Sequence, residues 1–509
     1  VIPRHDLETH VWSGMIVTDD AVTNAVIKLR KALGDNARNP RYIETIAKTG
    51  YRLIAETSAV ETVTGKQRPG FGGRLERLWR KTLIAALGLL LGGSILWWAT
   101  APEEAQIPIA ERVVDNTPVI AVMPLENLSA DPEQEYFANG ITEDLITDLS
   151  KQAGLRVVAR NSSFAYKDSG ETAAEIGSQL HARYLLMGSV RKDGKQLRIN
   201  IRLTDTKDGS NRWAERYDRK ATDIFRLQDE ITNNVVSVLQ VELSTRERQR
   251  LLKDYATDFE AYNLFLQGLD HFGRRSDEDS VLAKEYFGKA IAIAPKFARA
   301  YASLALTHTR DVFRGLGNAP DASLAMAESL VSKARQLDDS LPQVHFVSAE
   351  IAMYRGNYAA ALDHVSRAIE FKPSYADGYG LLGWILHWAG RPADGLQAVD
   401  KAFELNPRVP GLYYLVKGAL RYELDEIAEA TQLLETAVEM NPNNHVVRFF
   451  LAAAYAAGEN LDEARWQVDE ILVLNPDFTL ADVERVAPIR DPNYRDRFLR
   501  DLQRAGLSY

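Results

Sequence analysis

Hydrophobic and polar positions follow four different patterns along the chain, and each pattern predicts a different kind of structure. Apolar residues between 18 and 33 recur at helical spacing, which predicts an amphipathic helix. Residues 82–100 carry no charge, residues 197–203 alternate between apolar and polar, and a helical pattern repeats through residues 255–480. The chain is therefore expected to contain several units of different fold class rather than one core.

The uncharged stretch 82–100 (TLIAALGLLLGGSILWWAT) predicts a membrane-spanning helix. Its nineteen residues make a helix of about 29 Å, close to the thickness of a bilayer's hydrocarbon core. Positive charge accumulates on its N-terminal side, which predicts that residues 1–81 lie in the cytoplasm and residues 101–509 across the membrane. The basic residues on that side are Arg74, Arg77, Arg80 and Lys81.

Two other structures could explain the same stretch. One is a core helix of a globular domain. Such a helix usually carries a polar stripe that faces solvent, whereas every face of 82–100 is apolar or glycine. A signal peptide could end at Ala99-Thr100-Ala101, yet about eighty residues of apparently folded sequence precede it. We therefore expect a retained anchor, with linkers at 58–81 and 101–117.

Residues 1–57 show the start and end signals of one helix followed by two short strands. Thr18 is a good N-cap, and Gly34 can end the helix. The apolar stripe of this helix consists of Val22, Val26, Leu29 and Leu33. Residues 41–46 and 50–54 read as strands around a turn, and residues 5–11 as an earlier short helix.

The segments LRKALGD, NPRYIET and GYRL resemble the C-terminal part of an OmpR/PhoB-type winged helix-turn-helix, over about residues 4–55. That family's N-terminal sheet and first helix have no counterpart, so we expect Val1 to lie inside a domain of a longer gene product. The resemblance implies double-stranded DNA as partner, with helix 18–33 in the major groove and the 46–50 wing beside it. By position, we expect Thr23, Asn24 and Ile27 at base edges, Lys28, Arg30 and Lys31 at phosphates, and Lys48 and Arg52 at phosphates from the wing.

Two observations limit that expectation. The same residues could be solvated polar groups of a helix surface. Residues 1–57 also hold eight lysines and arginines against seven acidic residues, which is a weak electrostatic footprint for DNA. DNA affinity would then depend on dimerisation or on local phosphate contacts.

Residues 118–246 predict an α/β module of order βαβαββα, with a further short strand before the last helix. The expected elements are strands 119–123, 155–158, 184–191, 197–203 and 213–217, and helices 136–151, 172–181 and 222–243. Segments such as YLLMGSV and WAERYDR resemble the N-terminal domain of the Tol–Pal translocation protein, in the form found in bacterial membrane regulators with tetratricopeptide repeats. Some proteins of that kind are labelled adenylate cyclase-like, but no cyclase domain is recognisable here.

Catalytic chemistry finds little support. The candidate acids and bases Glu126, Asp131, Glu143, Asp144 and His181 form no recognised constellation, and we read Glu143 and Asp144 as charges in the first turn of a helix. There is no cysteine, which excludes thiol catalysis and cysteine-bound metals. We expect no catalytic residue, no metal and no cofactor.

Residues 255–480 predict a tetratricopeptide solenoid. Pro373, Pro407, Pro442 and Pro476 end successive units at spacings of 34, 35 and 34, which is the period of this repeat. We count five closed repeats, with 481–509 as a C-terminal cap. The solenoid predicts a groove for a protein or peptide. The aromatic candidates Tyr379, Trp384, His387 and Trp388 fall at core spacing.

The predicted fold class is therefore multidomain α and α/β: a partial winged helix, one transmembrane helix, an α/β module and a helical solenoid. The function that these parts imply is a one-component transcriptional regulator of the bacterial inner membrane. Its N-terminus would lie in the cytoplasm, its C-terminal region would sense in the periplasm, and it would act as a homodimer. The alternative is an envelope interaction scaffold with a degenerate DNA-binding remnant.

Overall fold

A computed structural model describes most of the chain after residue 116 and a small part of the winged helix. The described residues are 2–3, 25–26, 29–30, 33, 35, 40–46, 50–54, 117–241, 258–274, 276–313, 320–487 and 489–509. The stretch 82–100 and the predicted helix 5–11 lie outside them. None of the helices within the described ranges combines the length and the apolar character that crossing a bilayer requires.

The N-terminal described residues form a three-stranded antiparallel sheet. Its strands are β1 (Ile2–Pro3), β2 (Ile43–Ile46) and β3 (Gly50–Leu53), in the order β1-β3-β2. The two strands predicted from the sequence are thus confirmed, and they pair in register from Ile43 with Leu53 to Ile46 with Gly50.

The buried side of the preceding helix differs from the prediction. Leu29 and Leu33, placed on the apolar stripe, are 50% and 41% exposed, whereas Arg30 is 2% exposed. The guanidinium of Arg30 donates to the carbonyl of Ile43 and to the hydroxyl of Thr45, at 2.9 and 2.8 Å. Two hydrogen bonds to β2 offset the loss of solvation, so a charged residue occupies the inner face.

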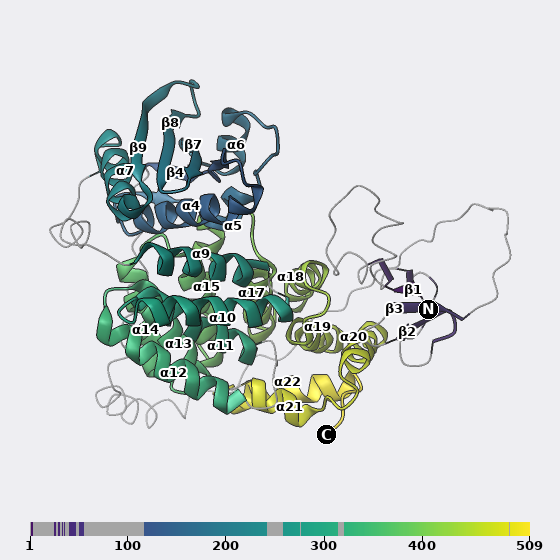
Figure 1. Ribbon diagram of the computed structural model, residues 1–509. Helices are drawn as coiled ribbons and strands as arrows, with labels where there is room; N and C mark the ends of the chain where they lie inside the picture. Colours follow the sequence, from purple (N-terminus) through teal and green to yellow (C-terminus); the bar gives the residue numbers. More distant parts are fainter. Residues whose placement is uncertain are drawn as a thin grey trace, which may run out of the picture.

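The α/β module is a sheet of mixed direction with helices on both faces (Figure 1). Strand order is β6-β4-β7-β8-β9, with β5 pairing β7 beside β4, and β7, β8 and β9 form an antiparallel meander. The strands are β4 (Val119–Val122), β5 (Glu126–Asn127), β6 (Arg156–Val157), β7 (Tyr184–Asp193), β8 (Gln196–Asp205) and β9 (Asn211–Lys220). The helices are α4 (Glu135–Ser150), α5 (Arg160–Phe164), α6 (Ala173–Gln179) and α7 (Ile224–Val238), with short 3-10 turns η1 (Pro132–Gln134) and η2 (Ala221–Asp223).

The local patterns account for these elements. The apolar positions of β8 are buried and the polar positions between them face outward, as the alternation predicted. Thr172 and Glu175 form a capping box at the start of α6. Strand β5 and helix α5 were not predicted, because a two-residue strand and a five-residue helix are too short to show a period.

The solenoid consists of antiparallel helix pairs that stack side by side. Within the described part of 258–480 the structure shows six pairs, one more than the five repeats counted in the sequence. The pairs are α9 (Phe259–Arg274) with α10 (Asp277–Ile293), α11 (Ala298–Phe313) with α12 (Pro320–Leu337), α13 (Pro342–Tyr354) with α14 (Tyr358–Phe371), α15 (Ala376–Trp388) with α16 (Pro392–Leu405), α17 (Gly411–Glu423) with α18 (Ile427–Met440), and α19 (His445–Ala457) with α20 (Leu461–Leu474). The aromatic candidates of α15 are buried core, as predicted.

The C-terminal helices cap the solenoid. They are α21 (Leu480–Val486) and α22 (Pro492–Arg504), drawn in yellow in Figure 1. Phe498 of α22 is fully buried among Tyr422, Phe449 and Phe450, which belong to α17 and α19. Helix α22 therefore covers the first helices of two neighbouring pairs, whereas a simple cap would cover only the end of the last repeat.

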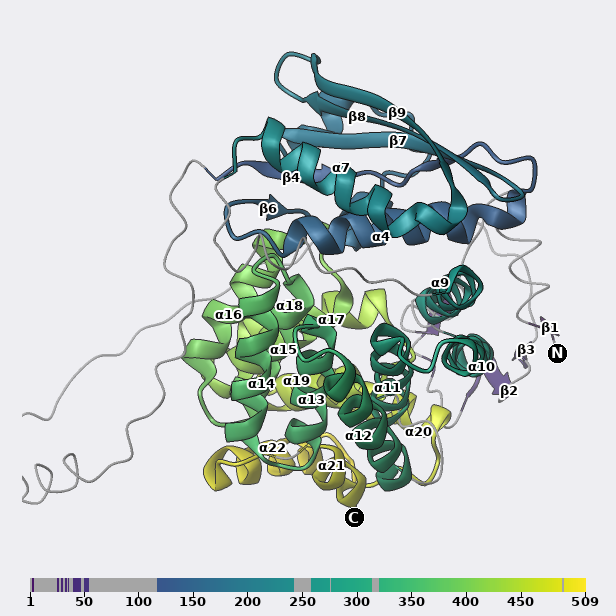
Figure 2. The ribbon, with the colours of Figure 1, turned by 60° about the vertical axis from the view of Figure 1, so that its left-hand side comes forward.

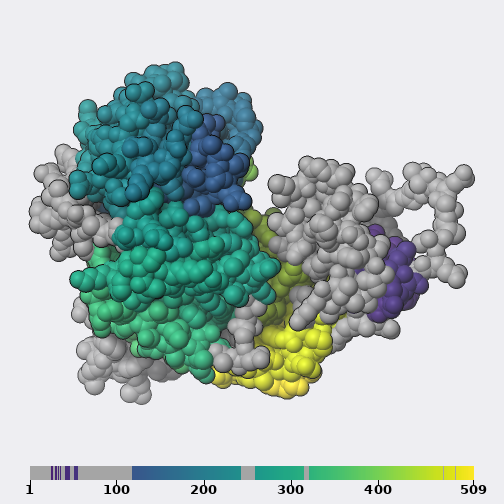
Figure 3. Space-filling view, viewed as in Figure 1, coloured from purple at the N-terminus to yellow at the C-terminus, as the bar shows by residue number. Residues whose placement is uncertain are grey.

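The module and the solenoid share one hydrophobic core. In two views 60° apart, α4 lies between the sheet and the solenoid (Figures 1 and 2), and the space-filling view shows the module seated directly on the first pairs (Figure 3). Tyr262, Phe265 and Leu266 of α9 belong to the same cluster as the α4 side of the sheet. Gly140 of α4 permits the approach, since a Cβ there would stand 2.5 Å from Leu266. We refer to residues 117–509 as the body of the protein.

Candidate functional site

Loops between helix pairs of the solenoid hold the edge of the α/β module. The amide of Ala159 donates to the carbonyl of Leu405 at 2.9 Å, and the amide of Ser374 donates to Ser150 at 3.3 Å. The Ser374 hydroxyl also accepts from the amide of Val157, at 3.1 Å. Backbone groups thus connect the two parts much as neighbouring strands are connected, and they fix the orientation of the module.

A partly open cavity of about 270 Å³ lies between the module and the solenoid. Residues of α4, α5 and α7 line one side, and residues of α9, α11, α13 and α15 line the other. Its apolar walls include Phe225, Phe265, Phe272, Phe346 and Tyr375. A cavity at a domain interface, with aromatic walls and several polar groups, has the usual composition of a small-molecule site.

A buried ion pair joins the two sides of this cavity. Asp144 of α4 is 2% exposed and forms a salt bridge with Arg299 of α11. The Tyr262 hydroxyl and the Gln228 amide donate to the same carboxylate, at 2.6 and 3.0 Å. Burial and the neighbouring carboxylate raise the pKa of Tyr262 well above its usual value, so the hydroxyl remains a donor.

This arrangement corrects the reading of Asp144 and Glu143 as first-turn charges. Both lie in the second half of α4, far from its N-terminus at Glu135. Asp144 is a buried carboxylate with a structural role, and Glu143 forms an ion pair with Arg160 at 3.2 Å. No sequence pattern pointed to Arg299, because it lies 155 positions from its partner.

Two further cations line the cavity without such partners. Lys372 follows α14, and Arg310 lies near the end of α11. The Lys372 ammonium lies 4.7 Å from the ring centre of Tyr375, and the Arg310 guanidinium lies 5.6 Å from that of Phe272. Burial lowers the pKa of Lys372 to about 8, although the nearby Asp377 carboxylate acts in the opposite direction.

The remaining catalytic candidates are dispersed over the module. Glu126 lies in β5, Asp131 caps η1, and His181 follows α6 in a left-handed conformation with φ 52°. Nowhere in the described ranges do three histidine or acidic side chains gather closely enough to hold a metal ion. These three candidates lie on separate elements of the module.

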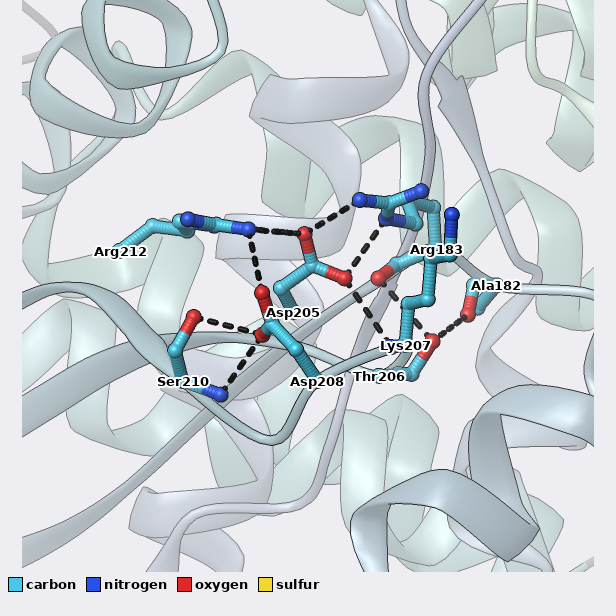
Figure 4. Close-up of polar contacts among 8 residues, drawn as sticks. All are labelled: Ala182, Arg183, Asp205, Thr206, Lys207, Asp208, Ser210 and Arg212. Carbon is cyan, nitrogen blue, oxygen red and sulfur yellow. Dashed lines mark hydrogen bonds and ion pairs between the residues drawn. The ribbon is translucent and has the colours of Figure 1, made fainter.

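A second polar cluster closes the turn between β8 and β9 (Figure 4). Asp205 is fully buried and accepts two hydrogen bonds from Arg183, at 2.6 and 2.7 Å, and two from Arg212, at 2.8 and 3.3 Å. The amide of Lys207 adds a fifth, at 3.0 Å. The hydrogen bonds from Arg183, with those from Arg212 and Lys207, lower the pKa of Asp205 far below its usual value in spite of its burial.

We expect Asp205→Asn to destabilise the body by about 1.5–3 kcal/mol at pH 7, because the charge-assisted bonds of one buried carboxylate are lost. A carboxylate with a depressed pKa stabilises the fold above its unfolded pKa of about 4, and this contribution fades as the pH falls. Urea unfolding at pH 7 and pH 3 should therefore show a smaller difference between variant and wild type at pH 3. Asp363→Asn, at an exposed pair with Arg367, should change stability little at either pH. A constant difference at both pH values would contradict this role of Asp205.

Of the eight residues predicted to contact DNA, two are among the described residues, Arg30 and Arg52. Thr23, Asn24, Ile27, Lys28, Lys31 and Lys48 lie outside them. Arg30 is buried against β2, and its guanidinium also lies 3.7 Å from Glu470 of α20. Arg52 is half-exposed on β3 and donates to Glu44 of β2 at 2.6 Å, so a phosphate would compete with that carboxylate.

Sequence reasoning missed one structural residue of this region. Asp35 is 1% exposed and accepts from the amides of Arg41, Tyr42 and Ile43, at 2.6 to 3.3 Å. Although burial opposes it, these amides hold the pKa of Asp35 below its usual value. The available signal was an acidic residue directly after Gly34, the predicted end of the helix, and its hydrogen bonds hold the segment that leads into β2.

Three family models match separate parts of the chain. Residues 1–53 match the C-terminal domain of transcriptional regulatory proteins, residues 116–251 match the second domain of HilA/YgeH-like transcriptional regulators, and residues 422–483 match the tetratricopeptide repeat. The first and third matches agree with the resemblances seen in the sequence. The second places the α/β module with transcriptional regulators, where the sequence resembled the Tol–Pal translocation protein.

Several individual proteins are similar over different lengths. The transcriptional activator CadC of Escherichia coli (strain K12) is 22% identical over 82% of this chain and 87% of its own length. The cholera toxin transcriptional activator of Vibrio cholerae (strain ATCC 39315 / El Tor Inaba N16961) is 44% identical over 12% of this chain and 21% of its own length. A protein of Rhizobium meliloti (strain 1021) named "Putative adenylate cyclase 3" is 41% identical over 46% of this chain, and the aligned part spans only 40% of that protein.

The similarity to regulators thus extends over most of the chain, from the winged helix to the repeats. The sheet β1-β3-β2 with its helix, the α/β module and the stacked helix pairs agree with the three matched models. By these matches the chain has the parts of a transcriptional regulator: a winged-helix DNA-binding domain, a HilA-like second domain and tetratricopeptide repeats.

Proposed function

We propose that the chain is a membrane-integrated one-component regulator, whose winged helix binds DNA in the cytoplasm under the control of the body in the periplasm. The observation that carries this proposal is the order of the parts. A winged-helix domain precedes the uncharged stretch 82–100, and a body with a partly open cavity follows it. A signal bound on one side of a bilayer would then act on DNA through one chain.

The orientation rests on the charges beside the stretch. Basic residues on its N-terminal side favour a cytoplasmic N-terminus in the inner membrane, with a single pass. Such a span would place Arg30 and Glu470 on opposite sides of the bilayer. Within one chain, the 3.7 Å approach of these two side chains is therefore incompatible with a single-pass topology. Topology mapping distinguishes the two arrangements.

For the DNA interface we keep the positional assignment with one change. Thr23, Asn24 and Ile27 are proposed at base edges, where an amide such as Asn24 can pair with adenine. Lys28, Lys31, Lys48 and Arg52 are proposed at phosphates. Arg30 is left out, because its guanidinium is committed to β2.

The body is proposed to sense a small molecule in preference to an extended peptide. The face formed by the first helices of the solenoid is covered by the α/β module at one end and by α22 at the other. A peptide groove would require that face to be open. A protein partner is still expected on the outer surfaces of the repeats, and no catalytic step is assigned to the body.

We expect deletion of residues 82–100 to move the protein out of the membrane fraction and to abolish regulated transcription. Without the span, the signal would have no path across the bilayer. The measurement is an operator-reporter assay, with fractionation of the same cells, that compares the full-length chain, the deletion and a version with an unrelated apolar span of equal length. The unrelated span should restore membrane association.

Normal regulation by the deleted protein would contradict membrane coupling. Loss of reporter activity in all versions, together with no gel shift by the winged helix in a full-length gene product, would favour the envelope scaffold. That alternative draws support from the balanced charge of residues 1–57 and from the engagement of both Arg30 and Arg52 within the domain. Dimerisation is the simplest coupling, since two linked half-site contacts raise DNA affinity.

A further inference from the structure

Every acidic group that lines the interdomain cavity already has a donor from the protein. Each of these carboxylates accepts at least one hydrogen bond or forms an ion pair. Asp144 is bonded by Arg299 and Tyr262, Glu143 by Arg160, Asp148 by Lys151 at 2.7 Å, and Asp377 by the Tyr413 hydroxyl at 2.6 Å, while Asp229 also has a partner.

Within the described part of the chain, two basic groups of the cavity lining form no ion pair, although the charge of Arg310 also acts on the buried carboxyl group of Glu350. Among the described residues, no carboxylate lies within ion-pair distance of Lys372 or Arg310, and neither side chain donates a hydrogen bond. Their close contacts are with the rings of Tyr375 and Phe272, which leave the N–H donors unused. The charged groups of the cavity lining whose N–H donors remain unused are therefore these two cations.

We propose that the cavity binds a small organic anion, whose carboxylate or phosphate group is held by Lys372 and Arg310. The volume of about 270 Å³ is at the lower end for ligand sites and suits a small metabolite. Phe272, Phe346 and Tyr375 would contact its carbon skeleton. This proposal deepens the sensing role and rests on it for its biological meaning, whereas binding itself is measured separately.

The first test compares four small probes on the purified full-length chain in detergent micelles by isothermal titration calorimetry. Succinate, succinamide and 1,4-diaminobutane share a four-carbon skeleton but are a dianion, a neutral amide and a dication, and inorganic phosphate is the fourth probe. We expect binding by succinate or phosphate, and the better of the two identifies the acid group. Binding by the diamine alone, equal binding by succinamide, or no binding by any probe would overturn the proposal.

The second test changes the two cations. Lys372→Gln and Arg310→Gln should each weaken binding of the better anion about tenfold or more, because each removes a charge-assisted hydrogen bond. Lys372→Arg should retain binding. Lys289→Gln, at an exposed pair with Glu285 on α10, is the matched control and should leave affinity unchanged. Wild-type affinity in both Gln variants, with unchanged thermal unfolding midpoints, would overturn the assignment.

The third test uses pH. Besides its burial, Lys372 is affected by Asp377, Glu143 and Asp148, which favour its charged form, and by Lys151, which opposes it. A bound anion needs the protonated lysine, whose pKa is about 8 in the empty site, so affinity should hold near pH 7 and fall above pH 8.

The same measurement with Lys372→Arg should show no fall above pH 8, because guanidinium keeps its charge. Arg310 faces Glu350, whose pKa burial raises to about 6, and titrations above pH 7 keep that group ionised. Equal pH profiles for wild type and Lys372→Arg would contradict a contact between the lysine and the anion. Intact anion binding without regulated transcription would count against the proposed function and leave the anion site standing.

Discussion

Replacing Arg299 by methionine should lower the free energy of unfolding of the body by about 3–5 kcal/mol, since it leaves the buried carboxylate of Asp144 without its counter-ion. The carboxylate is 2% exposed, so water cannot take the place of the guanidinium. Tyr262 and Gln228 would remain as donors but supply no charge. The measurement is urea unfolding of the full-length chain, followed by tryptophan fluorescence.

A matched substitution controls for the loss of an arginine as such. Arg355→Met removes a guanidinium from an exposed pair with Asp321 and should cost less than about 1 kcal/mol. The double variant Asp144→Leu/Arg299→Met should recover much of the lost stability, because a buried pair costs most when only one partner is removed. If Arg299→Met unfolded like Arg355→Met, the pair would not hold the module on the solenoid.

Replacing Phe498 by alanine should cost about 3–5 kcal/mol, the usual range for deleting a fully buried aromatic side chain. Its ring lies 4.9 Å from that of Phe450 and about 6 Å from those of Tyr422 and Phe449. The cavity that remains would lie between α22 and the first helices of two pairs. We therefore expect α22 to detach before the rest of the solenoid unfolds.

Hydrogen exchange measures that effect directly. Amides of α22 and α19 should exchange faster in Phe498→Ala, whereas those of the β7–β9 meander should keep their wild-type rates. Tyr509→Ala, at a 66% exposed ring near the C-terminus, is the control and should leave both regions unchanged. Uniformly faster exchange throughout the body would show that the cap and the module unfold together.

Patterns that depend on neighbouring residues were predictable from the sequence. The alternation along β8, the helix predicted over 172–181 and the proline spacing of the repeats are signals that can be read along the chain, and the structure has the corresponding elements. The buried aromatics of α15 followed from the same reasoning. Local periodicity is a reliable guide because the geometry of a helix or strand repeats within a few residues.

The site depends on pairs that no local pattern encodes. Asp144 and Arg299 are 155 residues apart, and Ser162 and Asn406, which share a 2.6 Å hydrogen bond, are 244 apart. Arg30 looked like a surface cation because its helix neighbours are basic, yet hydrogen bonds to β2 hold it inside. The cavity lies where the α/β module packs on the solenoid. The sequence pattern of either unit alone does not show that the two pack together.

The attachment of the module to the solenoid uses main-chain atoms at its centre, from the Ala159 amide to the Leu405 carbonyl and from the Ser374 amide to the Ser150 carbonyl. Every residue other than proline offers the same two groups, so substitutions at these positions leave the hydrogen bonds available. Side chains lining the cavity can therefore diverge in evolution while the frame around them persists. One architecture could in this way acquire new ligands by exchanging a few side chains.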